Sequence, residues 1–195
     1  MSRQRGYHHG DLRAALIATS FELLAEGGLR RFSVAAVARR LGVSSAAPYR
    51  HFPDRDHLLS AVSGAAAEDL RAAIRAAADA AGADPADRLA AVAGAYFRYV
   101  VTTGAGFHVI FAAELHRVAD EQRRARTRAL MDTLFELATA TAVPSYQQAL
   151  PLIEAIIAVG HGYSSLFTDG FFARNTRTVE EIATRATEAA RALIR

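Results

Sequence analysis

Residues 33–52, SVAAVARRLGVSSAAPYRHF, decide the fold of the first part of the chain. Ser33 is a suitable N-cap, because its hydroxyl can accept a hydrogen bond from a free N–H group of the first helical turn. Gly42 stands where a helix end with positive φ favours glycine. Between them, four apolar residues recur at the spacing of one helical face: Val34, Val37, Ala38 and Leu41. The stretch therefore predicts a helix that ends in a glycine turn.

A second short helix is expected directly after this turn. Val43 is an apolar plug between the two helices, and Ser44 can cap the second one. Pro48 removes one backbone donor, so this helix should be short. Two short helices around a glycine turn are typical of a helix-turn-helix, whose second helix enters the major groove of DNA. The same spacing also occurs in helical proteins that bind no DNA, so the spacing alone leaves both interpretations open.

The side chains of this motif have the chemistry that a DNA groove requires. Small residues allow close approach, hydroxyls and arginine reach base edges, and aromatic or imidazole groups reach phosphate. We expect Arg50 to read a base, Tyr49 and His51 to contact phosphate, and Arg55 to add a phosphate contact. For Tyr49, packing in the core is the alternative. The predicted DNA-binding residues are Ser33, Ser44, Ser45, Ala46, Tyr49, Arg50, His51 and Arg55.

Charge is distributed unevenly along the chain. The 195 residues include 23 basic side chains, all arginine, and 20 acidic ones, for a net charge of +3. Residues 1–60 hold nine arginines against five acids, whereas residues 61–195 hold fourteen against fifteen. A basic first part on a near-neutral body favours a polyanion as partner of the first part only. Arg3 and Arg5 could extend these contacts as a basic arm, with a solvated tail as the alternative.

Composition excludes several other classes of protein. The chain has no cysteine, so neither a disulfide framework nor a thiolate metal site is expected. Its first residues, MSRQRGYHHGDLR, lack the apolar segment of a secretory signal. The longest uncharged run, residues 137–153, is interrupted by Pro144 and Pro151 and is not expected to span a membrane. We expect a soluble cytoplasmic protein with no membrane partner.

No convincing metal or cofactor site is predicted. His8, His9 and Asp11 have no further ligand nearby in the sequence. A second set of side chains is spaced at i, i+6 and i+8, which does not gather three ligands on one helical face: His108, Glu114 and His116.

Helical patterns continue through the rest of the sequence, which predicts an all-α fold of about nine helices. A helix over 10–26 precedes the helix-turn-helix, and a long helix over 55–81 connects this basic unit to a body of five further helices. Their expected ranges are 86–102, 107–115, 119–141, 145–168 and 178–193. We place a helix-turn-helix DNA-binding domain at 1–55 and a ligand-binding and dimerisation domain at 56–195.

Start signals support several of these helices. Asp84 followed by Pro85 is typical of an N-cap and first helical position. Two pairs of residues match the capping-box pattern, in which a hydroxyl residue is followed three positions later by Glu or Gln: Ser145 with Gln148, and Thr178 with Glu181. Pro151 should kink or delay the helix that contains it.

An ordered set of residues in the first 60 positions matches a known family: Phe21-x-x-Leu24, Gly27-Gly28, Phe32-Ser33-Val34, Val37-Ala38, Leu41-Gly42-Val43-Ser44, Tyr49-x-His51-Phe52 and Leu58-Leu59. This set resembles the DNA-binding domain of TetR-family transcriptional regulators. Members usually have lysine where Arg55 stands. The runs 7–13 and 47–52 are similar to a subgroup whose C-terminal domain is named for a Trp, His and Gly motif. His161-Gly162 matches its last two residues, but the chain has no tryptophan.

The resemblance implies a homodimeric repressor with two helix-turn-helices on a palindromic double-stranded operator. It also implies a cavity in each body, where a small apolar or amphipathic molecule binds and releases the operator. Aromatic, apolar and imidazole side chains of the body are the candidates for this site, with an ordinary core as the alternative. They are Tyr96, Tyr99, Phe107, His108, Phe111, Met131, Phe135, Ile157 and His161.

Small residues on the last two predicted helices favour close helix packing. They suggest a four-helix dimer interface with two helices from each subunit, and packing within one subunit is the alternative. The predicted interface residues are Ile156, Gly160, Ser164, Phe167, Ile182, Ala186 and Ala190.

The leading functional hypothesis is therefore a ligand-responsive repressor. A second hypothesis is a DNA-binding regulator without a small-molecule ligand, controlled by a protein partner or by its own abundance. An enzyme is not expected, because the sequence has no Ser-His-Asp arrangement, phosphate loop or metal cluster.

Overall fold

The computed structural model describes residues 11–141, 145–173 and 177–194. Over these ranges the chain forms eight α-helices and three 3-10 helices, with no strand. The α-helices are α1 (Leu12–Gly27), α2 (Val34–Leu41), α3 (Arg55–Ala80), α4 (Pro85–Thr103), α5 (Phe107–Ile110), α6 (Glu121–Thr139), α7 (Tyr146–Thr168) and α8 (Val179–Arg191). The 3-10 helices are η1 (Leu29–Arg31), η2 (Pro48–Arg50) and η3 (Ala113–Arg117). The predicted all-α class is confirmed.

The expected nine α-helices become eight among the described residues, because the second helix of the helix-turn-helix is the 3-10 turn η2. Pro48 occupies its first position, where proline has a suitable φ but no N–H group to donate. The predicted helix over 107–115 also differs, since it divides into α5 and η3. The break falls at Ala112, whose extended backbone (φ −55°, ψ 131°) cannot continue a helix.

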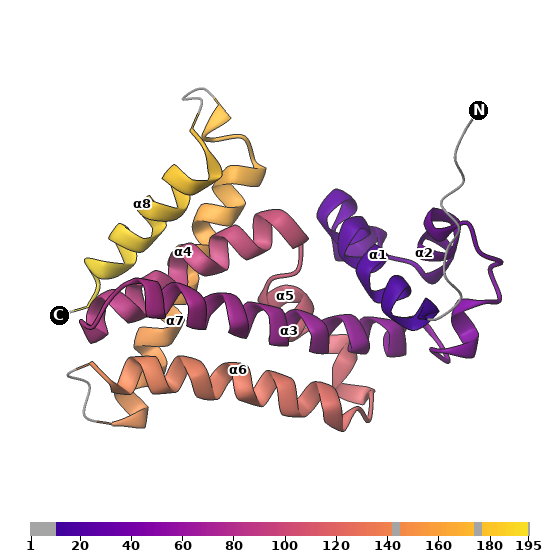
Figure 1. Cartoon of the computed structure of the whole chain (residues 1–195), viewed down its shortest axis with the longest axis horizontal. Helices are drawn as coiled ribbons and strands as arrows, with labels where there is room; N and C mark the ends of the chain where they lie inside the picture. The colour runs from indigo at the N-terminus through magenta and orange to yellow at the C-terminus, as the bar shows by residue number, and fades with distance from the viewer. Residues whose placement is uncertain (1–10, 142–144, 174–176, 195) are drawn as a thin grey trace.

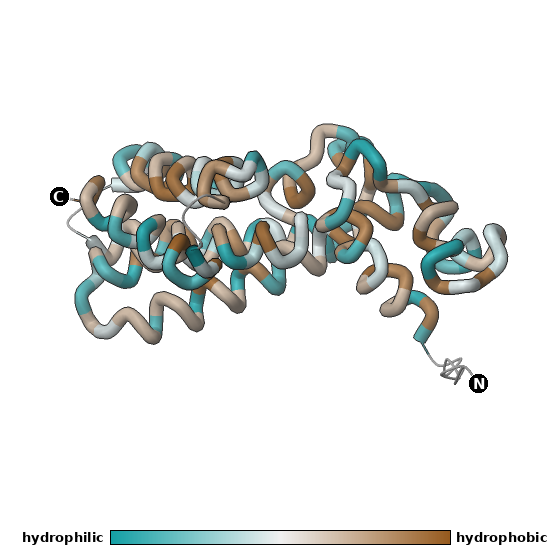
Figure 2. The backbone as a smooth tube through the Cα atoms, turned by 90° about the horizontal axis from the view of Figure 1, so that it is seen from above, coloured by the Kyte–Doolittle hydropathy of each residue, from teal (hydrophilic) through white to brown (hydrophobic). Residues whose placement is uncertain are grey.

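The molecule has a small head and a larger helical body (Figure 1). The head contains α1, η1, α2 and η2 and lies at one end, whereas the last described residues lie at the other end. Helix α3 runs from the head along the whole body beside α6. With 26 residues it is roughly 39 Å long at 1.5 Å per residue. Figure 2 shows the head projecting from the body in a second view.

Helix α4 lies at the centre of the body and packs against α3, α7 and α8. Its middle turns are buried on every side, and the fully buried Tyr96 and Phe97 are its largest side chains. Burying a large apolar side chain stabilises a fold by about 1.5–3 kcal/mol. One hydrophobic cluster continues from this region along α3 into the head, where it includes Leu58, Val37 and Leu16.

Side-chain caps define where most helices begin. The carboxylates of Asp11, Asp54, Asp84 and Asp120 accept hydrogen bonds from N–H groups in the first turns of α1, α3, α4 and α6. These bonds satisfy donors that have no partner inside the helix.

The two predicted capping boxes have different outcomes. At α8 the box is confirmed: Thr178 Oγ1 accepts from the Glu181 N–H, and the Glu181 carboxylate accepts from the Thr178 N–H at 2.7 Å. At α7 the prediction is wrong. Ser145 is the N-cap residue, but its hydroxyl turns to the Gln148 amide oxygen at 3.4 Å and caps no backbone N–H.

This contrast gives a stability prediction. Thr178→Ala should lower the free energy of unfolding by about 0.5–2 kcal/mol, because it leaves an N–H group of α8 without its partner. Ser145→Ala is the matched control and should change it by less than about 0.5 kcal/mol, as ordinary surface substitutions do. Urea unfolding followed by circular dichroism measures both. Equal losses in the two variants would contradict the assignment.

Candidate functional site

The head contains the helix-turn-helix at the predicted place. Ser33 Oγ accepts a hydrogen bond from the Ala36 N–H at 3.2 Å, so the hydroxyl caps α2. Gly42 ends the helix in the left-handed region (φ 69°), and the Val43 N–H donates to the Ala38 carbonyl at 3.1 Å. These bonds fix the direction in which the chain leaves α2. The segment that follows is therefore held at a defined angle to the helix.

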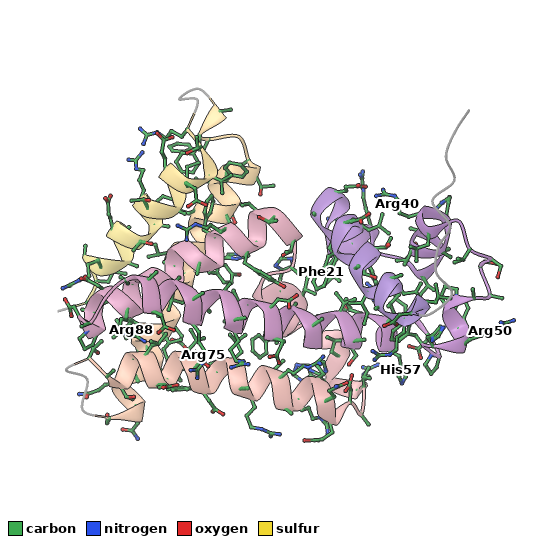
Figure 3. The ribbon with its side chains drawn as sticks, in the orientation of Figure 1. Phe21, Arg40, Arg50, His57, Arg75 and Arg88 are labelled. Carbon is green, nitrogen blue, oxygen red and sulfur yellow. The ribbon has the colours of Figure 1, made fainter. Side chains whose placement is uncertain are left out.

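Six of the predicted DNA-binding residues are exposed along this following segment. Figure 3 shows Arg50 at the far end of the head, pointing away from the body. Tyr49 is 53% exposed, so its alternative role in the core is wrong. Pro48 and Phe52 are buried, so they hold η2 against the core of the head. The exposed residues are Ser44, Ser45, Ala46, Tyr49, Arg50 and His51.

Charged side chains of the head divide into paired and unpaired ones. The Arg40 guanidinium donates to both carboxylate oxygens of Glu26, at 2.9 and 2.6 Å, and so joins α2 to α1. This bond raises the pKa of Arg40 and lowers that of Glu26. Arg39 and Arg50 are exposed, and neither forms an ion pair with another described residue. Arg39 is thus a candidate phosphate contact that the predicted set omitted, although its position off the apolar face signalled it.

Arg55 does not have the surroundings expected of a phosphate contact. Its guanidinium donates to the carbonyls of Phe32 at 3.3 Å and Leu29 at 3.5 Å, and lies 5.5 Å from the centre of the Phe32 ring. It also forms an ion pair with Glu114 of η3 at 3.4 Å. The predicted role is therefore corrected: the side chain joins the head to the body, because its donors are directed to groups inside the molecule.

In the body, four of the predicted ligand-binding residues gather at the junction of α4, α5 and α7. The Phe107 N–H donates to the Tyr96 hydroxyl oxygen at 3.2 Å, and this oxygen lies 3.2 Å from His161 Nδ1. Because the oxygen already accepts one bond, its own proton is free to be donated to Nδ1. The His161 ring centre lies 6.5 Å from that of His108. Hydroxyl and imidazole groups thus meet beside an apolar core.

The imidazole of His108 has a pKa below the ordinary value for histidine. Burial is the main cause, and the neighbouring His161 adds to it. The nearby backbone carbonyl of Gly104 acts in the opposite direction and raises the pKa. The balance favours a neutral ring that can donate at one nitrogen and accept at the other.

A groove of about 670 Å³ lies next to this junction on the surface of α6. Phe111, which is 42% exposed, lines it from the end of α5. The Phe111 ring contacts Phe107 at 5.1 Å between centres, and Phe107 contacts Tyr96 at 5.5 Å. Aromatic rings therefore lead from the groove to the hydroxyl and imidazole groups. The groove is lined by Phe111, Arg124, Thr127, Arg128, Met131, Asp132, Phe135, Glu136 and Thr139.

Two predicted ligand-binding residues lie apart from these groups. Ile157 is half-buried against the core. Tyr99 lines a separate groove of about 260 Å³ with residues of α3 and α4. Its hydroxyl is buried without a hydrogen-bond partner among the described residues, and burial together with Asp69 raises its pKa. Tyr99 therefore does not share a site with the other candidates.

The predicted dimer residues face into the subunit, so this prediction is wrong and the alternative of internal packing holds. A Cβ on Gly160 would lie 2.8 Å from the Ala93 carbonyl oxygen, which shows how closely α7 approaches α4. Phe167 is half-buried and its ring packs against Phe97 at 5.8 Å. The other predicted residues are all buried: Ile156, Gly160, Ser164, Ile182, Ala186 and Ala190.

Helix α7 carries small or apolar residues on two faces. The predicted dimer residues of α7 lie on the inner face, and the sequence alone does not distinguish this face from the outer one. Its outer face includes Ala158, Gly162, Ser165 and Leu166, all exposed, and a Cβ on Gly162 would meet no atom within 4 Å. Residues 147–168 are long and apolar enough to cross a membrane by length and composition. In the most apolar 18-residue stretch of this segment, only 22% of the residues are buried inside the subunit. The uncovered side of α7 thus carries small and apolar residues, with Glu154 and His161 also exposed.

The ranges that the structure describes contain no group of three or more side chains able to hold a metal ion. His108, Glu114 and His116 do not form such a group. The pair of imidazoles at the junction, His108 and His161, has no third ligand among the described residues. His8 and His9 lie outside the described residues.

Comparison with known families agrees with this architecture. The family model described as bacterial regulatory proteins, tetR family, matches residues 16–62. A second model, described as tetracyclin repressor-like, C-terminal domain, matches residues 89–190. The two matches cover the helix-turn-helix and the body in the order found here. The chain belongs to the TetR family, a family of DNA-binding transcriptional regulators rather than enzymes.

Individual proteins are similar to this chain in sequence or in fold. The chain is 31% identical to the HTH-type transcriptional regulator BetI of Stenotrophomonas maltophilia (strain R551-3) over 108 residues, 54% of this chain and 55% of BetI. It thus spans about half the length of this curated relative. A protein of unknown function from Rhodococcus sp. RHA1 has a TM-score of 0.72 at 28% identity, covering 98% of this chain and 99% of that one. A tetR-family regulatory protein from Rhodococcus RHA1 has a TM-score of 0.67 at 23% identity, covering 93% and 96%.

The exposed tip of the head gives a prediction for DNA binding. Arg50→Ala should weaken binding to a specific operator by roughly 1–3 kcal/mol, with the loss confined to one base-pair position if the guanidinium reads a base. Arg75→Ala is the control, because Arg75 pairs with Glu136 on the body, away from the head (Figure 3). Gel shifts on single-base operator variants measure this. A loss spread evenly over all sequences would assign Arg50 to phosphate instead.

Proposed function

We propose that this chain is a homodimeric repressor that a small amphipathic molecule releases from its operator. The observation that carries the proposal is the exposed segment Ser44–His51. It offers hydroxyl, guanidinium, imidazole and phenol groups at the end of the head, with no carboxylate bound to Arg50 among the described residues. Such groups suit the base edges and phosphates of double-stranded DNA. Family members are soluble cytoplasmic proteins, and we place this chain there too.

The effector is proposed to bind at the groove on α6 and the junction beside it. Phe111, Met131 and Phe135 offer apolar contacts in the groove, and the junction beyond Phe107 holds the two imidazoles. Small-molecule sites combine apolar contacts with polar groups that orient the ligand, and in this groove Arg124, Arg128, Asp132 and Glu136 supply charged groups beside the apolar ones. The site suits a molecule with an apolar body and one polar end that donates or accepts hydrogen bonds.

Dimerisation is proposed to cover the outer face of α7. Its small residues, Ala158, Gly162 and Ser165, permit close approach of a second helix, and Leu166 adds apolar area. Apolar side chains exposed on α7, such as Leu150 and Leu166, are unfavourable in water when they gather in a patch. A two-fold interface places the same face of each subunit against the other, so the chain's own α7 is a suitable partner.

The repressor proposal is tested by a gel shift on intergenic DNA beside the gene. Sequence-preferring binding at about 0.15 M salt is expected, where purely electrostatic contacts are weak. A panel of metabolites should then contain a compound that raises the melting temperature of the protein and releases the DNA. Binding without any preference for sequence would reject the repressor proposal. Specific binding with no responsive compound would favour a regulator controlled by a partner or by its abundance.

The dimer proposal predicts a change in mass. Leu166→Arg should convert the dimer to a monomer, because it places an uncompensated charge in an apolar interface. Ala76→Arg adds the same charge to an exposed position of α3 outside α7 and α8, and should leave the dimer intact. Light scattering after size-exclusion chromatography measures the mass. A Leu166→Arg protein that stays dimeric would assign the interface to another face.

The effector proposal predicts which variants lose the response. Phe111→Ala and His161→Ala should each raise the concentration of the releasing compound needed for half-release by about tenfold, the effect of roughly 1.4 kcal/mol. His116→Ala is the control, since this histidine is exposed on η3 outside the groove. Fluorescence anisotropy of labelled operator DNA measures release. An unchanged response in both test variants would move the effector site elsewhere.

A further inference from the structure

The imidazole of His161, in the His161-Gly162 pair of α7, is exposed and yet bonded to the core. Its side chain is exposed to solvent, although Nδ1 lies 3.2 Å from the hydroxyl oxygen of the fully buried Tyr96. The ring is directed to the side of α7 that meets α4 and α5, since the ring of His108 on α5 lies 6.5 Å away between centres. One end of this imidazole is therefore fixed, and the other is available to a ligand.

Hydrogen bonds determine which nitrogen of His161 carries the proton. The Tyr96 hydroxyl oxygen accepts from the Phe107 N–H at 3.2 Å. Burial raises the pKa of Tyr96, so the hydroxyl keeps its own proton. This proton needs an acceptor, because a buried donor without a partner is unfavourable. Among the described residues, His161 Nδ1 is the acceptor that it meets.

The network therefore assigns the tautomer of His161. Because Nδ1 accepts from the Tyr96 hydroxyl, the proton of the neutral ring lies on Nε2. Nε2 has no hydrogen-bond partner in the ranges that the structure describes. His161 thus presents an N–H donor that no other group of the described chain uses.

Two glycines allow the close packing that this series of bonds requires. An ideal Cβ on Gly160 would lie 2.8 Å from the Ala93 carbonyl oxygen and 3.0 Å from Tyr96 Cδ1, so α7 packs on α4 without a side chain between them. An ideal Cβ on Gly106 would lie 2.6 Å from the Tyr96 hydroxyl oxygen. The donor of His161 is therefore positioned before a ligand arrives, which lowers the entropic cost of binding.

The surroundings of this donor favour an anionic acceptor. Neither His161 nor His108 is paired with a carboxylate among the described residues. A carboxylate has two oxygens that accept hydrogen bonds and no proton of its own, and bonds to a charged acceptor are stronger than neutral ones. A protonated amine has donors only, so it would oppose the Nε2–H group.

We propose that His161, fixed by Tyr96 as an Nε2–H donor, binds the carboxylate of an effector that has an apolar body. The inference rests on the proposed function in one respect, since it places the effector at this junction. It narrows the polar end of the effector to a hydrogen-bond acceptor. Tyr96 is a positioning residue, which acts through His161, and the apolar body of the effector lies along Phe111 in the groove.

Matched pairs of compounds test the class of ligand. The probes are hexanoate, decanoate and phenylacetate, each compared with the amine of the same carbon skeleton by isothermal titration calorimetry. At least one carboxylate should bind at least about tenfold more tightly than its amine, a difference of roughly 1.4 kcal/mol. A series in which no carboxylate reaches this preference would overturn the proposal.

His161→Phe keeps an aromatic ring at this position and removes the donor. It should weaken binding of the carboxylate by about 2- to 10-fold, the effect of one ordinary hydrogen bond, and change binding of the amine by less than about twofold. Equal losses for the two compounds would show a structural role only and would reject the proposal. His116→Phe is the control and should keep the preference, because His116 is exposed on η3 outside the groove.

The tautomer of His161 can be measured without any ligand. NMR spectra of the imidazole nitrogens, recorded at about pH 8 where free imidazole groups are neutral, should show the proton on Nε2. Tyr96→Phe removes the donor to Nδ1 and should move part of the population to the Nδ1–H tautomer. Tyr99→Phe is the matched control on α4, since the Tyr99 hydroxyl has no hydrogen-bond partner among the described residues. A proton on Nδ1 in the parent protein, or an unchanged spectrum in Tyr96→Phe, would contradict the assignment.

The outcomes separate this inference from the proposed function. If the parent protein binds no specific DNA but binds a carboxylate through His161, the proposed function fails and the site remains. If a compound releases the operator while His161→Phe leaves the carboxylate preference unchanged, the function stands and this inference is rejected.

Discussion

The continuity of α3 is the constraint on which the arrangement of the molecule depends. One uninterrupted helix of 26 residues contributes Leu58, Leu59 and Val62 at the head end and Leu70 and Ile74 within the body. The head is therefore joined to the body by a helix and not by a loop, and Ser63-Gly64 is the point within α3 where such a helix bends most easily. The position of the head also depends on the contacts that the body makes with it beside α3. The ion pair of Glu114 with Arg55 and the end of α4 are such contacts, and both lie near residues of the proposed effector site.

Local rules predicted the head well. The recurrence of Val34, Val37 and Ala38, the cap at Ser33 and the glycine at 42 each agree with the structure, because all of them act within one or two helical turns. Pro48 also predicted a short second helix, and the 3-10 turn is shorter still. The direction of Arg55 was not predictable, since its partners at Leu29, Phe32 and Glu114 are remote in sequence.

In the body, contacts between helices that are distant in sequence determine which residues are buried, and local sequence patterns do not predict these contacts. Small residues on α7 indicated a close helix contact but not which of two faces makes it. Gly160 and Ser164 pack inward on α4, whereas Gly162 and Ser165 remain outside. The candidate ligand-binding residues also divide between two places. Tyr96 and Tyr99 are three positions apart on α4, but Tyr96 contacts His161 and Tyr99 lines a separate groove. The predicted boundary at residue 55 stays a prediction, since α3 belongs to both units.

The groove on α6 has a kinetic consequence. Its walls come mainly from one helix, with Phe111 exposed at the side, and no described segment covers it as a lid. A ligand can therefore reach the groove itself without waiting for a conformational opening, and this first contact is set by diffusion and concentration. Where an enzyme closes over its substrate to exclude water, a sensor gains from remaining open. Occupancy of this groove would follow a falling concentration as promptly as a rising one, limited only by how long each molecule stays bound.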